Sequence, residues 1–249
     1  MSGHSKWHSI KHKKAVVDAR RGQHFTKLAR AITIAAREGG GDPDGNSGLA
    51  LAIQKARDAS MPKDNIERAI AKGTGEAGDA EQIETVLYEG YGPGGVALLI
   101  EALTDNRNRT GSEVRHLLSK YGGNLGEPGS VSYLFEKSGV IVVDASRYDE
   151  EDLMPAIDAG AQDITLDDDV FEVLTEPGDL AAVREALEQA GIELESADVT
   201  QRPRARVPVN EADAAKLMKL IDALEESDDV AAVHANFDVD ASVLERIAS

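Results

Sequence analysis

The 249-residue chain contains no cysteine, and aromatic residues make up only 4% of it. The lack of cysteine excludes disulfides, thiol nucleophiles and thiolate metal sites, and it fits a reducing compartment. No run approaches the roughly 18 apolar residues of a membrane span, and the N-terminus lacks the apolar stretch of a secretory signal. We therefore expect a cytoplasmic protein that has no membrane partner.

Catalytic and cofactor motifs are also scarce. The stretch Gly73–Gly78 matches G-x-G-x-x-G, but it follows a predicted helix rather than a strand and is therefore not a dinucleotide fingerprint. His116 and His234 are isolated, and no nucleophile and base stand at a recognisable spacing. We predict a protein that is not an enzyme and that has no cofactor, catalytic residue, bound metal or small-molecule substrate.

Acidic residues dominate the chain, yet its first 37 residues are basic. That segment holds nine Lys and Arg residues against one acid, Asp18, while the whole chain carries a formal charge of −18. Residues 38–249 therefore carry a net charge of −26. A basic end on an acidic body attracts a polyanion at that end and repels it elsewhere, which predicts nucleic-acid contact through the N-terminus.

Residues 1–12 read as an extended arm, and a helix follows them. In the arm, Trp7 offers a ring for base stacking, and the lysines can neutralise phosphates. His4, His8 and His12 recur every four residues, as a metal site could use, but no carboxylate accompanies them and we predict no metal there. The predicted nucleic-acid-binding residues are His4, Lys6, Trp7, Lys11, His12, Lys13, Lys14, Arg20, Arg21, Lys27 and Arg30.

Apolar spacing predicts an α+β protein of three domains. Residues 1–80 form the basic, nucleic-acid-binding N-terminal domain, with helices around 25–36, 49–56 and 62–72. Residues 136–203 show the β-α-β-β-α-β order of a ferredoxin-like domain, with its last strand at 192–199. The remaining strands and helices, in 81–135 and 204–249, are predicted to form one discontinuous middle α/β domain.

The middle domain is expected to begin with a hairpin of strands 86–89 and 96–101, joined by a Gly-rich turn. Thr110 and Glu113 have the spacing of a capping box and predict a helix that begins there. A strand is expected around 131–135. The tail reads as a strand at 205–209, a helix and a strand at 230–235, which we expect to return to the sheet of the hairpin.

The polar loop 104–110 is a second candidate patch. Arg107 and Arg109 stand close to the predicted start of a helix, where guanidinium groups and free N–H groups could bind a phosphate. In so acidic a region, the same arginines could instead form internal ion pairs. Both interpretations stay open at the level of sequence.

Several long strings in this chain resemble the YebC/PmpR family, which includes mitochondrial translational activators. The resemblance runs nearly end to end, and its strings occur in the family's order. They are GHSKW at 3–7, IKHKKA at 10–15, FTKL at 25–28, GGGDP at 39–43, MPKDNIERAI at 61–70, YEGYGPGG at 88–95, TDNRNRT at 104–110 and GGNLG at 122–126.

The resemblance implies three domains, a discontinuous middle domain, and a cytoplasmic, non-enzymatic protein. It implies a nucleic-acid role for residues 3–7 and 10–14, which match family motifs. Bacterial members are usually described as DNA-binding transcriptional regulators, whereas other members act in translation on the ribosome. We expect a nucleic-acid-binding regulator of gene expression, nominally of transcription, with a ribosome- or RNA-associated translation factor as the alternative.

Overall fold

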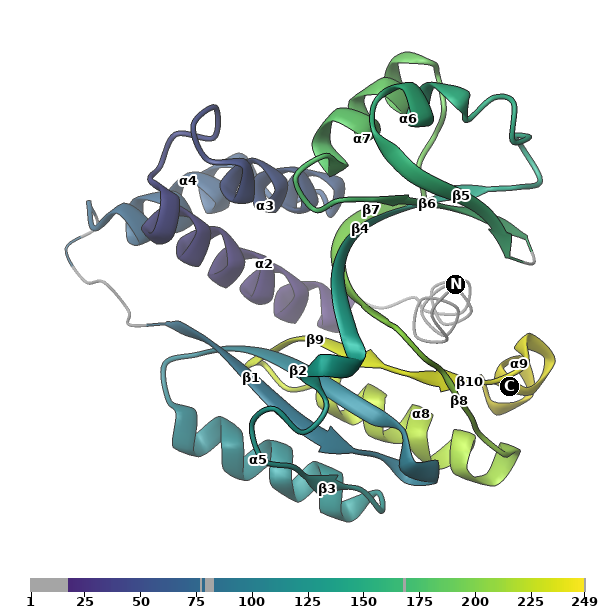
Figure 1. The fold of residues 1–249 in the computed structure, drawn as a ribbon. Helices are drawn as coiled ribbons and strands as arrows, with labels where there is room; N and C mark the ends of the chain where they lie inside the picture. Colours follow the sequence, from purple (N-terminus) through teal and green to yellow (C-terminus); the bar gives the residue numbers. More distant parts are fainter. Residues whose placement is uncertain (1–17, 77, 79–82, 168, 249) are drawn as a thin grey trace.

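The computed structural model describes residues 18–76, 78, 83–167 and 169–248. They form an α+β protein in which an N-terminal group of helices packs beside two α/β domains (Figure 1). The first group is the helical domain. It consists of α2 (Asp18–Gly39), α3 (Ser47–Asp58) and α4 (Lys63–Thr74).

The three helices of the helical domain share one apolar core, built on Ile32, Leu49, Ile53 and other aliphatic side chains. Helices α2 and α4 approach closely where Gly73 lies. A Cβ atom at Gly73 would lie 2.4 Å from the carbonyl oxygen of Thr33, so a larger residue would push the helices apart. The helical periodicity predicted for this region is confirmed.

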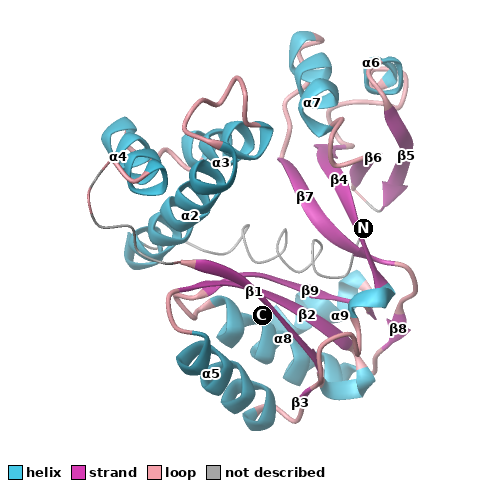
Figure 2. Cartoon of the chain, turned by 60° about the vertical axis from the view of Figure 1, so that its left-hand side comes forward, coloured by secondary structure: helices cyan, strands magenta, loops and turns pink. Residues whose placement is uncertain are grey.

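The middle domain contains a four-stranded sheet of order β3-β1-β2-β9, with its strands antiparallel. Helices α5 and α8 cover one face of this sheet, and α2 lies on the opposite face (Figures 1 and 2). The elements are β1 (Glu84–Tyr91), β2 (Ala97–Thr104), α5 (Arg107–Lys120), β3 (Asn124–Leu125), α8 (Glu211–Glu225) and β9 (Val230–Ala235).

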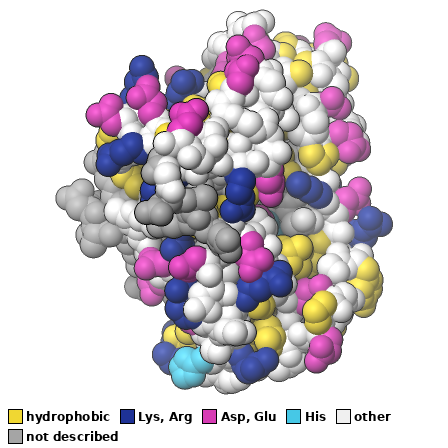
Figure 3. Space-filling model, turned by 90° about the vertical axis from the view of Figure 1, so that its left-hand side faces the viewer, with side chains coloured by type: hydrophobic (Ala, Val, Ile, Leu, Met, Phe, Trp, Pro, Cys, Tyr) yellow, Lys and Arg dark blue, Asp and Glu magenta, His cyan; other side chains and the backbone are white. Residues whose placement is uncertain are grey.

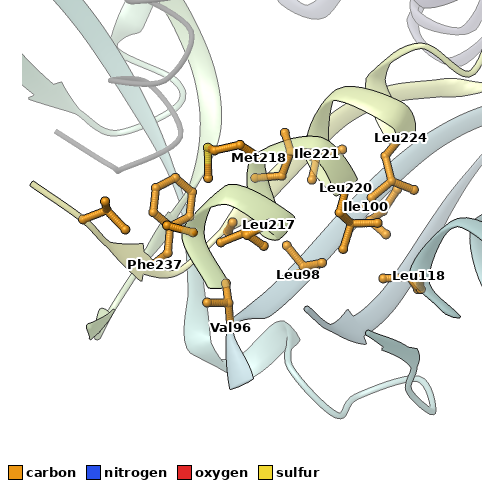
Figure 4. Close-up of a cluster of buried hydrophobic side chains, with 14 of the residues drawn as sticks. Val96, Leu98, Ile100, Leu118, Leu217, Met218, Leu220, Ile221, Leu224 and Phe237 are labelled. Atoms are coloured by element: carbon orange, nitrogen blue, oxygen red, sulfur yellow. The ribbon is translucent and has the colours of Figure 1, made fainter. Parts of the chain in front are cut away.

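Aliphatic side chains from β2, α5 and α8 fill the space between the sheet and its helices (Figure 4). Leu98, Ile100, Leu217 and Leu220 are fully buried there. Strand β9 comes from the C-terminal part of the chain and pairs with β2, so the middle domain is discontinuous as predicted.

The third domain has the strand order β5-β6-β4-β7, all antiparallel, which is the ferredoxin-like arrangement expected from the order of its elements. Its helices pack on one face of the sheet. Strands β4 and β7 are long and run down to the middle domain (Figure 2). The elements are β4 (Phe135–Asp144), α6 (Met154–Asp158), β5 (Ala161–Asp167), β6 (Val170–Thr175), α7 (Leu180–Gln189) and β7 (Ser196–Pro203).

Three local predictions were wrong. The capping box at Thr110 is not used, because α5 begins three residues earlier: the Asn106 side chain accepts a hydrogen bond of 3.1 Å from the Arg109 N–H. The segment around 131–135 is a 3-10 turn, η2 (Ser132–Leu134), followed by β4. The last strand of the third domain begins at Ser196 rather than at residue 192.

The tail completes the middle domain only in part. Strand β8 (Val207–Pro208) does not join the main sheet but pairs in parallel with β10 (Phe237–Asp238). The hairpin of β1 and β2 turns through η1 (Pro93–Gly95), where Gly94 and Gly95 have φ of 74° and 75°. Helix α9 (Ala241–Ala248) ends the described chain.

Candidate nucleic-acid interface

The N-terminal part of the predicted interface lies outside the described residues. Arg20 and Arg21 fall in the first turn of α2, where the side chains are not described. Lys27 and Arg30 are the members of the predicted set whose side chains the structure describes. The residues outside the description are His4, Lys6, Trp7, Lys11, His12, Lys13 and Lys14.

Lys27 lies against the end of helix α8. Its ammonium donates a hydrogen bond of 2.5 Å to the carbonyl oxygen of Glu225, the last residue of that helix. Gln23, one turn earlier on α2, donates to the carbonyl oxygen of Glu226 and, at 2.9 Å, to the carboxylate of Asp228. Cationic and N–H donors satisfy the free carbonyls at a helix C-terminus. Burial lowers the pKa of Lys27, although the nearby carboxylates of Glu225 and Asp228 oppose that shift.

Arg30 lies between α2 and the sheet of the middle domain. Its guanidinium donates to the carboxylate of Asp229 at 2.8 Å, to the carbonyl oxygen of Asp228 at 2.8 Å and to that of Leu103 at 3.2 Å. Lys27 and Arg30 therefore fasten the helical domain to the middle domain. While these contacts hold, Lys27 and Arg30 are not available to bind phosphates. The remaining residues of the predicted nucleic-acid-binding set all precede Gly22 in the sequence.

Asp229 is the centre of this contact, and only 4% of the residue is exposed. One carboxylate oxygen accepts from Arg30 at 2.8 Å, and the other accepts from Thr110 at 2.6 Å and from the Arg109 guanidinium at 2.7 Å. Burial opposes ionisation of Asp229, but the hydrogen bonds from Thr110, Arg109 and Arg30 outweigh it and lower the pKa of this carboxyl.

The second candidate patch is occupied by ion pairs. Arg107 pairs with Glu84 at 2.8 Å, and Arg109 pairs with Asp105 and Asp229 at 2.7 Å each. These hydrogen bonds raise the pKa of Arg109 above its usual range. The structure thus contains the internal ion pairs that were the alternative interpretation of these arginines.

Sequence reasoning did not identify Asp229. The residue follows a run of acids, and nothing local separates it from Asp228, which is exposed. Its position in the sequence could have identified it. Asp229 directly precedes strand β9, whose residues are largely buried, and a side chain at the start of such a strand is expected to be buried too. Its three principal partners come from α2 and α5, more than a hundred residues away in the sequence.

Basic and acidic side chains are interspersed on the face that Figure 3 draws, and no large area of one sign is visible there. Among residues 18–248 with the stated gaps, no group of three or more His, Asp or Glu could hold a metal ion. No helix within the described part of the chain is long and apolar enough to cross a membrane.

Comparison with known proteins places two family models on the chain. Residues 5–76 match the model described as the TACO1/YebC protein N-terminal domain, and residues 83–237 match the model of the TACO1/YebC second and third domain. A crystal structure of a conserved hypothetical protein from Aquifex aeolicus superposes with a TM-score of 0.83 at 52% identity, covering 93% of this chain and 96% of that one.

Curated relatives match over the full length. A protein of Rubrobacter xylanophilus is 55% identical over 249 residues, which is 100% of both chains. A protein of Persephonella marina is 55% identical over 250 residues, covering 99% of this chain and 100% of its own. Both relatives carry the name "probable transcriptional regulatory protein".

Proposed function

The chain belongs to the TACO1/YebC family, and from this we propose that it is a non-enzymatic, nucleic-acid-binding regulator of gene expression that acts in the cytoplasm. Regulation of transcription is the nominal assignment, because the similar proteins of Rubrobacter xylanophilus and Persephonella marina bear that name. The proposed ligand is the phosphate backbone of a nucleic acid, bound by the basic residues between His4 and Arg21.

The charge distribution carries this proposal. The first 37 residues hold nine basic residues against one acid in a chain of net charge −18. The structure adds that Lys27 and Arg30 are engaged with the middle domain. A short basic stretch of sequence in an otherwise acidic chain supports a contact confined to one end of the protein.

The proposal is tested by replacing Lys11, Lys13 and Lys14 together with Ala and measuring binding to nucleic acid over a range of salt concentrations. The logarithm of the binding constant should fall less steeply with the logarithm of salt, by roughly 0.7 to 0.9 for each phosphate that a lysine no longer neutralises. A control variant replaces the exposed Lys63, Lys216 and Lys219 with Ala and removes the same charge elsewhere. An unchanged slope in the first variant would contradict the proposal.

A translation factor that binds structured RNA is the second candidate, and the packing of α2 supports it. A helix that reads bases in the DNA major groove must be exposed along its reading face. Helix α2 packs against α3 and α4 on one side and against the middle domain on another. A basic segment at the start of such a helix can bind structured RNA as well as it can bind DNA.

Sucrose-gradient sedimentation of a cell lysate at low salt distinguishes the two candidates. Migration with ribosomal particles that survives DNase and disappears with RNase would favour translation. Fast sedimentation that DNase abolishes, without ribosomal association, would favour transcription.

A further inference from the structure

Two segments without any acidic residue meet where the third domain joins the middle domain. Residues 128–135 lead into β4, and residues 201–209 leave β7. The pairing of Phe135 with Pro203 is extended by a 2.8 Å hydrogen bond from the N–H of Arg204 to the carbonyl oxygen of Leu134. These backbones are therefore held side by side.

The second of these segments carries Arg202, Arg204 and Arg206 within five residues. Arg204 and Arg206 are exposed, and Arg202 is partly buried. Arg204 stands 3.7 Å from the exposed carboxylate of Glu136, a contact that contributes little in water. Arg206 has no hydrogen-bond or ion-pair partner among the residues that the structure describes. In a body of net charge −26, this is a local excess of positive charge.

The first segment carries Tyr133, one residue before the point where its backbone bonds to that of Arg204. Tyr133 is 67% exposed, more than any other large hydrophobic residue of the described chain, although aromatic residues are rare in it. It directly precedes Leu134, whose carbonyl accepts the hydrogen bond from Arg204. An exposed aromatic ring thus lies one residue from the backbone contact with the segment between β7 and β8 that carries Arg204 and Arg206.

A buried carboxylate fixes the turn that carries Tyr133. Glu89 on β1 is 8% exposed and accepts backbone N–H groups from Gly129, Val131 and Ser132 at 2.6–2.8 Å. Its burial favours the neutral acid, but these N–H groups outweigh that effect and lower the pKa of Glu89. The ring is therefore presented on a rigid turn, which reduces the entropy that a ligand must overcome.

We propose that Tyr133, Arg204 and Arg206 form a second nucleic-acid contact, in which a base of a single-stranded segment stacks on the tyrosine ring and the arginines bind the adjacent phosphates. This proposal rests on the proposed function and extends it to a surface outside the N-terminal domain. Proteins that bind single strands combine a basic track with exposed aromatic rings, because every base has a face that can stack.

A duplex fits this surface less well, since its bases are already stacked on one another and a single ring cannot reach a base face. An acidic peptide would use the arginines but would gain little from the aromatic ring. The presence of exposed Tyr133, Arg204 and Arg206 on two adjoining segments therefore favours a single strand.

The test measures binding of the full-length protein to a labelled oligouridylate and to a duplex of the same length. Tyr133→Ala should weaken binding of the single strand about tenfold, the effect of removing the stacking of one base, and leave duplex binding unchanged. Tyr133→Phe keeps the ring and should bind as the unmodified protein does. Replacing Arg204 and Arg206 with Ala should reduce the salt slope by about 0.7 for each phosphate that an arginine no longer neutralises.

The control for the arginines replaces Arg147 and Arg246 with Ala, because both are exposed, ion-paired and distant in sequence. Binding of the single strand that is equal in the Tyr133→Ala and Tyr133→Phe variants would overturn the proposal, as would equal weakening for single strand and duplex. If only the variant of Lys11, Lys13 and Lys14 binds more weakly, the proposed function stands and this second surface does not. If the unmodified protein does not bind the single strand, the second surface is also ruled out.

Discussion

The helical domain touches its two neighbours through contacts of different kinds. Against the middle domain it places Arg30 on the buried Asp229 and packs Ile34 with Ile83 and Leu103. Against the third domain it forms ion pairs that solvent reaches: Lys55 with Asp198 at 2.6 Å, and Asp58 with Arg184 at 3.3 Å.

The difference follows from burial. The carboxylate of Asp229 has given up its water, so its partners must replace that hydration and their removal is costly. The side chains of Asp198 and Asp58 are 44% and 50% exposed, although that of Arg184 is only 16% exposed, so these carboxylates keep water, and water and salt weaken both attractions. The contact with the middle domain should therefore be rigid, and the contact with the third domain should yield to salt.

The largest expected effect is that of Asp229→Ala. The substitution removes the carboxylate that neutralises the Arg30 guanidinium and accepts from the buried Thr110 hydroxyl, and leaves these donors with backbone carbonyl acceptors to replace it. We expect the free energy of unfolding to fall by about 3 kcal/mol, at the lower end for a broken buried ion pair because half of the Arg109 side chain is exposed. Urea denaturation followed by circular dichroism measures this change.

Asp228→Ala provides the matched control at the neighbouring position. Asp228 is exposed and its carboxylate accepts a hydrogen bond from Gln23. Its removal should cost less than about 1 kcal/mol. Equal destabilisation by the two substitutions would mean that burial does not distinguish the two aspartates.

The comparison of these contacts also shows which features a sequence reveals. Helices α2, α3 and α4 and the ferredoxin-like order follow from apolar spacing, which is a local signal. The return of β9 to the hairpin follows from a different argument, since a short tail of strand, helix and strand cannot bury a sheet face alone. Two of the three wrong predictions concern segments that bond to distant partners, and the third is the start of strand β7. The Thr110 hydroxyl bonds to Asp229, and Val131 and Ser132 donate to Glu89 rather than to a neighbouring strand.

The candidate site was predictable to a smaller extent. The excess of basic residues near the N-terminus is visible in composition alone, as is the possibility that Arg107 and Arg109 form ion pairs. That Lys27 and Arg30 contact the middle domain could not be deduced, because most of their carbonyl and carboxylate partners lie about 200 residues later. Charge patterning predicts where a polyanion is attracted, but it does not show which lysines the fold already uses.

A smaller effect is expected from pH, and it tests the ionised state of Asp229. Because the pKa of this carboxyl is lowered in the folded protein, its contribution is fully present above the unfolded value of about 3.9 and is lost as pH falls through the folded value. Asp229→Asn carries no charge at any pH. The stability difference between the two proteins should therefore shrink as pH falls below about 3.9.

Urea midpoints of both proteins, measured from neutral pH downward, follow this change. Glu89 also has a lowered pKa, but it is present in both proteins and its contribution cancels in the difference. A stability difference that stays constant across the acid range would mean that Asp229 stabilises the fold through packing and hydrogen bonds and not through its charge.

The smallest effect on stability is expected for the contact with the third domain. Replacing Lys55 and Asp58 with Ala removes both ion pairs and leaves Arg184 paired with Glu188, so the free energy of unfolding should fall by about 1 kcal/mol or less. The apolar contact of Leu51 with the core of the third domain remains in this variant. High salt should mimic the substitution in the unmodified protein, since it screens the same charges.

Small-angle X-ray scattering at low and high salt measures this response. If the two ion pairs hold the third domain against the helical domain, the radius of gyration of the unmodified protein should rise with salt toward that of the double variant, which should not change. The Asp229→Asn variant should keep the salt response, because its substitution lies in the other contact. A radius that is insensitive to both salt and substitution would show that Leu51 and its apolar neighbours hold the third domain in place, and that the two contacts differ in composition without differing in rigidity.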